Sequence, residues 1–399
     1  MSASEAVEDP AESKVPVGRV AVIWDGRFRA YDMGSAHPFN EAGRDHAVRL
    51  FESSLSSEQH QAIHWERKIE PADEDVLRTF HDESYLEFVR NASRDPERIL
   101  LDARETPSFP GCFEASARIA AGTEWGARWA MGEGRVALAS AGGLHHAWPK
   151  YAAGFCIFND VAIAIAVARK AKKRVAYVDL DAHHGDGVMY GFYRDGGVLD
   201  IDFHQDGRTL FPGTGFPSET GEGDGAGLKV NIPLPPGAGD EALVPLAQRI
   251  LPRMFHDFRP DLLVLQHGID GHWGDPLAKL QFTPSGYAEV DRLLIRLASK
   301  FDGRILITGG GGYRAGTVAR MLARTGRLFG GLEVPADDAP LPARWRAEFT
   351  EEFGSAAPQR WADRPNPAPT PWSSDAEAAL VDDLESALGR RFPVSAEAL

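Results

Sequence analysis

The sequence contains few cysteines and no long apolar run. Its two cysteines, Cys112 and Cys156, are too few for a disulfide framework. No apolar stretch reaches the ~18 residues that a transmembrane helix requires, and the N-terminus lacks the basic-then-apolar pattern of a signal peptide. These absences argue against a disulfide-stapled domain and against a membrane protein. We therefore expect a cytoplasmic protein.

Basic residues are in deficit as well. Lys and Arg number 43 against 58 Asp and Glu, which gives a formal net charge of −15. Because negative charge repels phosphate groups, we expect neither nucleic acid nor an anionic membrane as a direct partner. Hydrophobic residues make up 43% of the 399 positions, enough for a sizeable core in one large or two ordinary domains. The composition is that of a globular protein.

Sequence patterns divide the chain into three parts. Residues 1–17 are small and acidic and show no hydrophobic periodicity, which is typical of a disordered tail. Residues 18–331 alternate between apolar runs, helical patterns and Gly-rich loops, as expected for one catalytic domain. Residues 332–399 are rich in Pro and Ala and contain three Trp and one clear helical pattern at 374–390. We predict an extension that packs partly onto the domain through its Trp side chains, with an extended segment at 365–371.

Short apolar runs alternate with helical patterns through the central part. An apolar run without polar alternation suits a strand that is covered on both faces, as in a parallel sheet between helices. The pattern therefore predicts an α/β fold with a mostly parallel central sheet and helices on both faces. We expect strands at residues 19–24, 135–139, 175–178, 197–203, 261–266 and 304–308, and helices at 41–55, 72–90 with a break near 81, 113–130, 161–172, 240–255 and 284–300.

Asp and His side chains crowd the end of the strand that begins at residue 175. Five of the eight residues from 179 to 186 are Asp or His. Side chains alternate along an extended chain, so Asp179, Asp181 and His183 share one side. Imidazole and carboxylate ligands suit zinc or a similar divalent ion, and a catalytic site typically takes three protein ligands. Asp181 and His183 are candidates for two of them; the alternative is a capped, solvated turn.

Other strand ends carry further candidate groups. His145 and His146 follow a Gly-Gly pair that permits close approach of a ligand, and two adjacent side chains cannot both point into a core. With carboxylates from the next strand end, they suggest two His–Asp dyads. Asp270 and a run of four Gly before Tyr313 follow two later strands. One site assembled from several loops fits this distribution.

These motifs, taken in order, match those of one family. They are His37-Pro38, Gly143-Leu144-His145-His146-Ala147, the run from Gly154 to Asp160, the run from Asp179 to Gly187, Phe211-Pro212-Gly213-Thr214-Gly215, and Gly309-Gly310-Gly311-Gly312-Tyr313. With them, the chain between about residue 20 and residue 331 resembles the zinc-dependent histone deacetylase superfamily, which includes bacterial acetoin-utilisation proteins and acetylpolyamine amidohydrolases. The resemblance implies the arginase/deacetylase fold. It also implies a zinc-dependent amidohydrolase that removes an acetyl or another short acyl group from lysine side chains of proteins or peptides.

The resemblance implies roles for individual residues. The implied zinc ligands are Asp181, His183 and Asp270. The implied catalytic residues are His145, His146, Asp179, Asp186 and Tyr313. His146, paired with Asp186, would act as the general base, and the Tyr313 hydroxyl would donate a hydrogen bond to the developing oxyanion.

Substrate-binding positions are implied in the same way. Phe155 and Phe211 resemble the two aromatic walls of an acyl-lysine tunnel, with Gly154 beside them. Glu105 aligns with a rim aspartate that holds the substrate backbone in some relatives. Leu277 occupies the place where polyamine-selective relatives can carry a glutamate, so we expect no strong preference for polyamines.

Asp202 departs from the family pattern. Many relatives carry at this position a serine that contributes to a monovalent-cation site beside Asp179. We expect the added carboxylate to change how potassium is held there.

Other functions remain open alternatives. The same zinc chemistry could act on an acetylpolyamine or another small N-acyl amine. Arginases share the implied fold and hydrolyse a guanidino group with two manganese ions, but they need more ligands than Asp181, His183 and Asp270 supply. A catalytically silent acyl-binding module is a third class, which is disfavoured because every catalytic position is filled.

Overall fold

A single parallel sheet forms the centre of the protein. The computed structural model describes residues 19–39, 41–102, 105–132, 134–363 and 372–392. Its strands are arranged in the order β2-β1-β3-β8-β7-β4-β5-β6, and all of these neighbours pair in parallel. The strands are β1 (Val20–Ile23), β2 (His64–Glu66), β3 (Val136–Ala139), β4 (Val175–Asp179), β5 (Val198–Gln205), β6 (Lys229–Leu234), β7 (Leu262–Gln266) and β8 (Ile305–Thr308). The predicted α/β class is confirmed.

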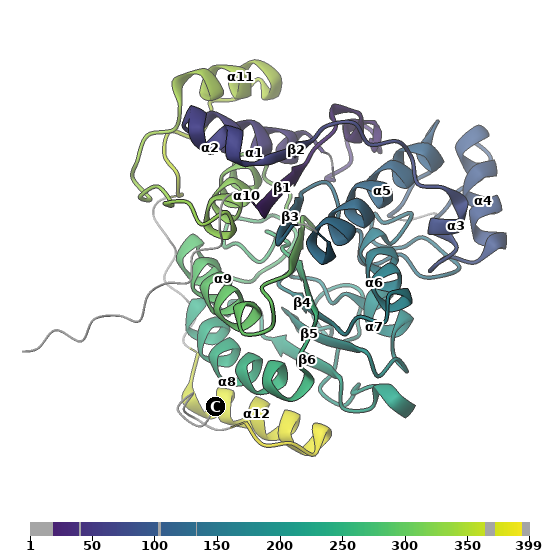
Figure 1. Cartoon of the computed structure of the whole chain (residues 1–399), viewed down its shortest axis with the longest axis vertical. Helices are drawn as coiled ribbons and strands as arrows, with labels where there is room; N and C mark the ends of the chain where they lie inside the picture. Colours follow the sequence, from purple (N-terminus) through teal and green to yellow (C-terminus); the bar gives the residue numbers. More distant parts are fainter. Residues whose placement is uncertain (1–18, 40, 103–104, 133, 364–371, 393–399) are drawn as a thin grey trace, which may run out of the picture.

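Helices cover both faces of this sheet (Figure 1). The helices α5, α6 and α7 lie on one face, whereas α1, α8, α9 and α10 lie on the other. Covered on both sides, every strand except β2 is buried along its whole length. The α-helices are α1 (Ala42–Ser53), α2 (Ser57–Ala62), α3 (Glu74–Leu77), α4 (Glu83–Arg94), α5 (Cys112–Met131), α6 (Asp160–Lys170), α7 (Asp186–Gly191), α8 (Asp240–Phe258), α9 (Pro284–Ser299), α10 (Ala315–Phe329), α11 (Ala343–Phe353) and α12 (Ser374–Leu388), and two short 3-10 helices span Gly26–Ala30 and Gly223–Gly225.

Several elements were not predicted from the sequence. Strand β2 has only three residues and is partly exposed, so it carries no apolar signal. Strand β6 contains Lys229 and Asn231, which are residue types typical of loops. Both are buried and hydrogen-bonded in the structure, and Lys229 Nζ donates to the carbonyl oxygen of Val198 at 2.7 Å. Helix α10 was also not predicted, although Val318, Met321, Leu322 and Phe329 are buried at helical spacing along it.

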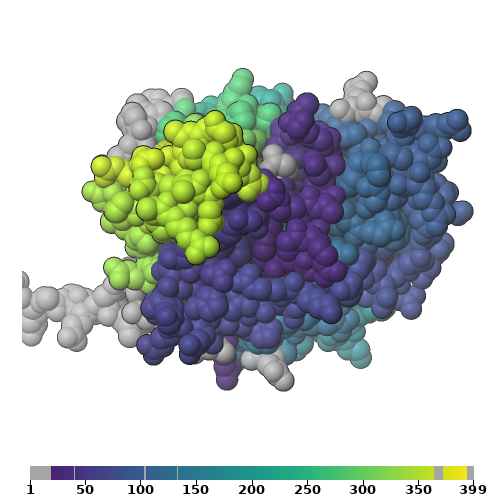
Figure 2. Space-filling model, turned by 90° about the horizontal axis from the view of Figure 1, so that it is seen from above, coloured from purple at the N-terminus to yellow at the C-terminus, as the bar shows by residue number. Residues whose placement is uncertain are grey.

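The described residues after 331 include two helices, where the sequence predicted one. Helix α12 corresponds to the predicted segment and packs beside α8 and β6, whereas α11 is additional. Figure 2 shows the yellow-green segment around α11 against N-terminal residues drawn in purple and blue. Trp345 of α11 is fully buried there and donates from Nε1 to the carbonyl oxygen of His46 at 2.9 Å. The predicted tail at 1–17 and the predicted extended segment at 365–371 lie outside the described residues.

The strand order brings the polar strand ends together. Strands β3, β8, β7, β4 and β5 are consecutive in the sheet although they are far apart in the sequence. All five run in the same direction, so the loops after them meet at one edge, where α/β sheets bind ligands. In the part of the chain that the structure describes, no helix is both long and apolar enough to cross a bilayer.

Candidate active site

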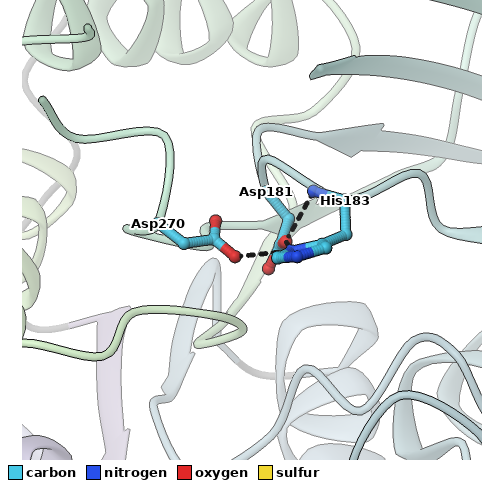
Figure 3. A group of neighbouring side chains, drawn as sticks. All are labelled: Asp181, His183 and Asp270. Atoms are coloured by element: carbon cyan, nitrogen blue, oxygen red, sulfur yellow. Dashed lines mark hydrogen bonds and ion pairs between the residues drawn. The ribbon is translucent and has the colours of Figure 1, made fainter. Parts of the chain in front are cut away.

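Asp181, His183 and Asp270 form a compact group at this edge (Figure 3). One ligand atom from each lies within 4.8 Å of the others, and all three residues are buried. His183 Nδ1 lies 3.1 Å from Asp181 Oδ1 and 2.8 Å from Asp270 Oδ2. Asp181 and His183 come from the loop after β4, and Asp270 comes from the loop after β7.

The electrostatics of this group fit a cation. Burial alone would lower the pKa of His183, but Asp270 and Asp181 raise it to about 10. Burial and the charge of Asp181 raise the pKa of Asp270 well above its usual range. Two buried carboxylates in contact with one imidazole are costly without a positive charge between them. A divalent ion with nitrogen and oxygen ligands, such as zinc, would supply that charge.

The adjacent histidines each contact a carboxylate, as the sequence predicted. His145 Nδ1 lies 2.8 Å from Asp179 Oδ2, and His146 Nδ1 lies 2.7 Å from Asp186 Oδ1. The two Nε2 atoms are 3.0 Å apart. Burial, with a smaller contribution from His145, lowers the pKa of His146 to about 4, although Asp186 opposes the shift. His146 is therefore neutral at pH 7, as a general base must be.

Asp179 and Asp202 lie in the buried layer below the dyads. Asp179 Oδ2 accepts hydrogen bonds from His145 and from the Tyr177 hydroxyl, and Asp179 Oδ1 accepts from the backbone N–H of Asp181 at 2.9 Å. Asp202 pairs with Asp179 across β4 and β5, and its Oδ2 accepts from the N–H of Gly185 at 2.7 Å. Among the described residues, Asp202 Oδ1 has no hydrogen-bond partner.

Tyr313 reaches the site from the Gly-rich loop after β8. The N–H of Gly311 donates to Asp181 Oδ2 at 2.6 Å, so this loop is bonded to the candidate metal group. A Cβ atom at Gly311 would lie 2.0 Å from Asp270 Oδ2, which requires glycine there. The Tyr313 ring makes edge contacts with Phe155 and His183, with centroid distances of 5.9 and 6.5 Å. Burial, together with the charge of Asp270, raises the pKa of Tyr313, so its hydroxyl stays protonated and can donate.

The two predicted wall residues contact different members of the candidate site. Phe155 contacts Tyr313, whereas Phe211 packs edge-on against His146 at a centroid distance of 5.0 Å. Phe211 is 38% exposed, which places it at the surface end of the site. A Cβ atom at Gly154 would lie 2.4 Å from His146 Cδ2 and 2.9 Å from Phe211, so only glycine fits between them.

The two predicted rim residues are connected to the site through their backbones. His37 Nε2 lies 3.2 Å from the carbonyl oxygen of Glu105, and the His37 ring packs edge-on against Phe155 at 4.6 Å. Leu277 is 38% exposed, and its N–H donates to Asp275 Oδ1 at 2.9 Å. The same carboxylate accepts the N–H of Tyr313 through Oδ2 at 2.9 Å.

Two residues with contacts to the site were not predicted. Asp275 holds the backbone of Tyr313, and Trp148 donates from Nε1 to Asp186 Oδ2 at 2.8 Å. Each stands in a loop that already carries a candidate residue, five positions after Asp270 and two after His146. Closeness in the sequence to a candidate residue is the only signal that could have indicated them, because neither residue belongs to a motif shared with the family.

Comparison with known proteins identifies the family. The family model described as "Histone deacetylase domain" matches residues 37–328. The chain is 33% identical to the acetoin utilization protein AcuC of Bacillus subtilis (strain 168) over 351 residues, which cover 86% of this chain and 89% of that protein. It is 32% identical to AcuC of Staphylococcus xylosus over 351 residues, covering 86% and 90% of the two chains. The chain belongs to the histone deacetylase family of hydrolases.

Proposed function

We propose that this protein is a zinc-dependent deacylase that hydrolyses acyl-lysine amides in proteins or peptides. The observation that carries the proposal is the joint geometry of the metal group and the dyads. A buried Asp181–His183–Asp270 group lies at the same sheet edge as His146, a neutral histidine held by Asp186. A water activated for attack needs both a polarising cation and a base with these properties.

The ion would supply Lewis acidity toward the amide carbonyl and toward water. His146 Nε2 faces the site because Nδ1 is bound to Asp186, so His146 accepts the proton of the attacking water. As the C–N bond breaks, a protonated histidine of the His145–His146 pair donates a proton to the leaving amine. The Tyr313 hydroxyl donates a hydrogen bond to the carbonyl oxygen as negative charge develops on it. The products are a carboxylic acid and the free amine.

Aromatic walls and the rim support lysine as the substrate class. Phe211 packs on His146 and Phe155 packs on Tyr313, so the two rings can enclose an alkyl stem and exclude water from it. The loop that carries Glu105 is hydrogen-bonded to His37, which packs on Phe155, so an acidic residue stands beside that wall and could bind a peptide backbone. Leu277, exposed on the opposite loop, gives a polyamine no carboxylate to bind.

The alternative substrate is an acetylpolyamine or another small N-acyl amine, which the same chemistry would hydrolyse. The discriminating experiment compares an acetyl-lysine peptide, N-acetylputrescine and N-acetylspermidine at equal salt, with acyl chains from acetyl upward. We expect the peptide to have the highest kcat/KM. A clear preference for the polyamines would reject the lysine assignment and leave the hydrolytic chemistry in place.

A monovalent cation, potassium, beside Asp179 and Asp202 is also part of the proposal. Its support is the buried Asp202 Oδ1, which has no partner among the described residues, next to a second buried carboxylate. Cation binding would offset the mutual repulsion of these groups. We expect potassium to raise the melting temperature of the wild type more than that of Asp202→Ser; equal shifts would argue against a role for Asp202.

A further inference from the structure

Trp148 contacts the carboxylate that holds the proposed general base. It lies in the loop between His146 and Gly154, and its Nε1–H donates to Asp186 Oδ2 at 2.8 Å. The other oxygen of this carboxylate, Oδ1, lies 2.7 Å from His146 Nδ1. The two contacts together fix the plane of the carboxylate, since each oxygen has its own partner.

Two tyrosines hold the indole ring in place. Tyr151 and Tyr190 both stack on Trp148, with centroid distances of 5.3 and 5.1 Å and interplanar angles of 17° and 24°. Tyr151 follows Trp148 in the same loop and is 47% exposed, whereas Tyr190 belongs to α7, four residues after Asp186. The aromatic stack therefore joins this loop to the helix that begins with the dyad carboxylate.

The stack also reaches the loop that carries Phe211. The Tyr190 hydroxyl donates to Glu219 Oε1. Glu219 Oε2 accepts the backbone N–H groups of Gly215 at 2.7 Å and Phe216 at 2.5 Å. One set of connected contacts thus joins the dyad carboxylate to the loop that carries Phe211.

We propose that Trp148 is a positioning residue for catalysis, acting through Asp186 on His146, with Tyr190 fixing the indole plane. This inference rests on the proposed function, because it assumes that His146 is the base. Hydrogen bonds to an ionised acceptor are among the stronger ones, and losing this one would leave the Asp186 carboxylate free to turn about its remaining contact with His146, which misaligns the imidazole. It would also leave more negative charge on the oxygen that faces His146 and so make His146 more basic.

The inference predicts a defined kinetic change for Trp148→Phe in the metal-loaded enzyme. We expect kcat to fall ~10–100-fold, as for other residues that orient a catalytic group, with KM and metal content unchanged. The acidic limb of the kcat/KM profile should move to higher pH, because a more basic His146 stays protonated, and inactive as a base, up to a higher pH. The charged or titratable groups around His146 include Asp186, His145, His183, Asp179, His184 and Cys156, and none of them is altered by the substitution.

Trp24 provides the matched control. Its Nε1 donates to Asp45 Oδ1 at 2.8 Å, the same distance and acceptor type, in a buried place outside the site. Trp24→Phe should leave kcat and the pH profile unchanged at equal metal content. Tyr190→Phe, which keeps the ring but loses the bond to Glu219, should lower kcat less than Trp148→Phe.

A second variant separates the N–H group from the ring. Replacing Trp148 by 3-benzothienylalanine keeps the shape and the stacking but puts sulfur in place of N–H, so it tests the hydrogen bond even if Trp148→Phe does not fold. We expect the same loss of kcat and the same shift of the acidic limb. Wild-type kcat and pH profile in this variant would overturn the role of Trp148. Absence of turnover in the wild type would instead reject the proposed function.

Discussion

At the residue scale, the two dyads have different surroundings although their histidines are adjacent in the sequence. His145 is held by Asp179, which lies deep among Tyr177 and Asp202, whereas His146 is held by Asp186, which contacts Trp148 nearer the surface. His146 also packs against Phe211. Under the proposed function, His146 is therefore the histidine that would meet a substrate stem lying along Phe211.

The general base and the oxyanion donor can be tested by single substitutions. His146→Ala removes the proton acceptor and Tyr313→Phe removes only a hydroxyl, so each should lower kcat ~10²–10⁴-fold. Neither residue belongs to the Asp181–His183–Asp270 group, so the metal content should stay at the wild-type level. Steady-state kinetics and metal analysis check both expectations. Turnover at the wild-type rate would remove that residue from the mechanism.

At the element scale, loops after neighbouring strands hold one another. Asp275, in the loop after β7, accepts the N–H of Tyr313 from the loop after β8 at 2.9 Å. Asp275→Ala would release this loop and is expected to lower kcat while the metal stays bound, since Asp275 lies outside the candidate metal group. Asp275→Asn keeps an acceptor oxygen and should retain more activity. Equal kcat in the wild type and the Ala variant would show that the bond does not position Tyr313.

His81, between α3 and α4, links stability to pH. It is buried, and its Nε2 accepts the N–H of Asn159 at 2.9 Å, so the folded state requires neutral imidazole. Burial lowers the pKa of His81 to about 3 from an ordinary value of 6.5. The unfolded chain therefore binds the proton first, and stability falls as pH decreases from about 6.5 toward 3, by a few kcal/mol at most.

A non-titrating variant isolates this contribution. His81→Gln keeps an acceptor for Asn159 but cannot gain a proton, so its free energy of unfolding should depend less on pH between 6.5 and 4 than that of the wild type. Urea unfolding at several pH values measures the difference. Parallel curves for the two proteins would show that His81 does not titrate on unfolding.

The sequence predicts most elements and the candidate site residues that the structure brings to one sheet edge, but not the contacts between loops. Apolar runs such as 175–178 gave the strands, and the break near 81 was correctly placed because the structure ends α3 at Leu77 and begins α4 at Glu83. Strand β6 was missed because Lys229 and Asn231 are polar, and their burial depends on partners distant in the sequence. The contacts of Trp148 and Asp275 depend on the same kind of partner, which sequence periodicity does not report.

At the scale of the whole molecule, the two C-terminal helices pack at different places: α11 lies against N-terminal residues, whereas α12 lies beside α8 and β6. Helix α11 packs on α1, where Trp345 is buried, and Glu352 contacts Arg29 and His46, the latter at 2.9 Å. The site lies at the ends of β3, β4, β7 and β8, so this attachment contributes stability and not catalytic groups.

Truncating Trp345 tests whether the packing of α11 contributes stability without contributing to catalysis. Trp345→Ala leaves a large cavity and removes the hydrogen bond from Nε1 to the carbonyl oxygen of His46, so we expect a loss of ~3–5 kcal/mol in the free energy of unfolding. At a temperature where the variant is folded, kcat should equal that of the wild type. Trp372→Ala, at a half-buried position, is the control and should cost less. A large fall in kcat for folded Trp345→Ala would assign α11 a role in the site.

Metal-dependent amide hydrolysis is tested by measuring bound metal and acetate release from an acetyl-lysine peptide on the same sample. The sample is measured before chelation, after chelation and after zinc is restored. We predict one divalent ion per chain at the Asp181–His183–Asp270 group, with acetate and free lysine formed in equal amounts. Turnover should disappear with the ion and return with zinc, whereas Asp181→Ala should neither bind the ion nor recover. Acetate release that continues at the same rate in the metal-free protein, or in Asp181→Ala, would contradict the account.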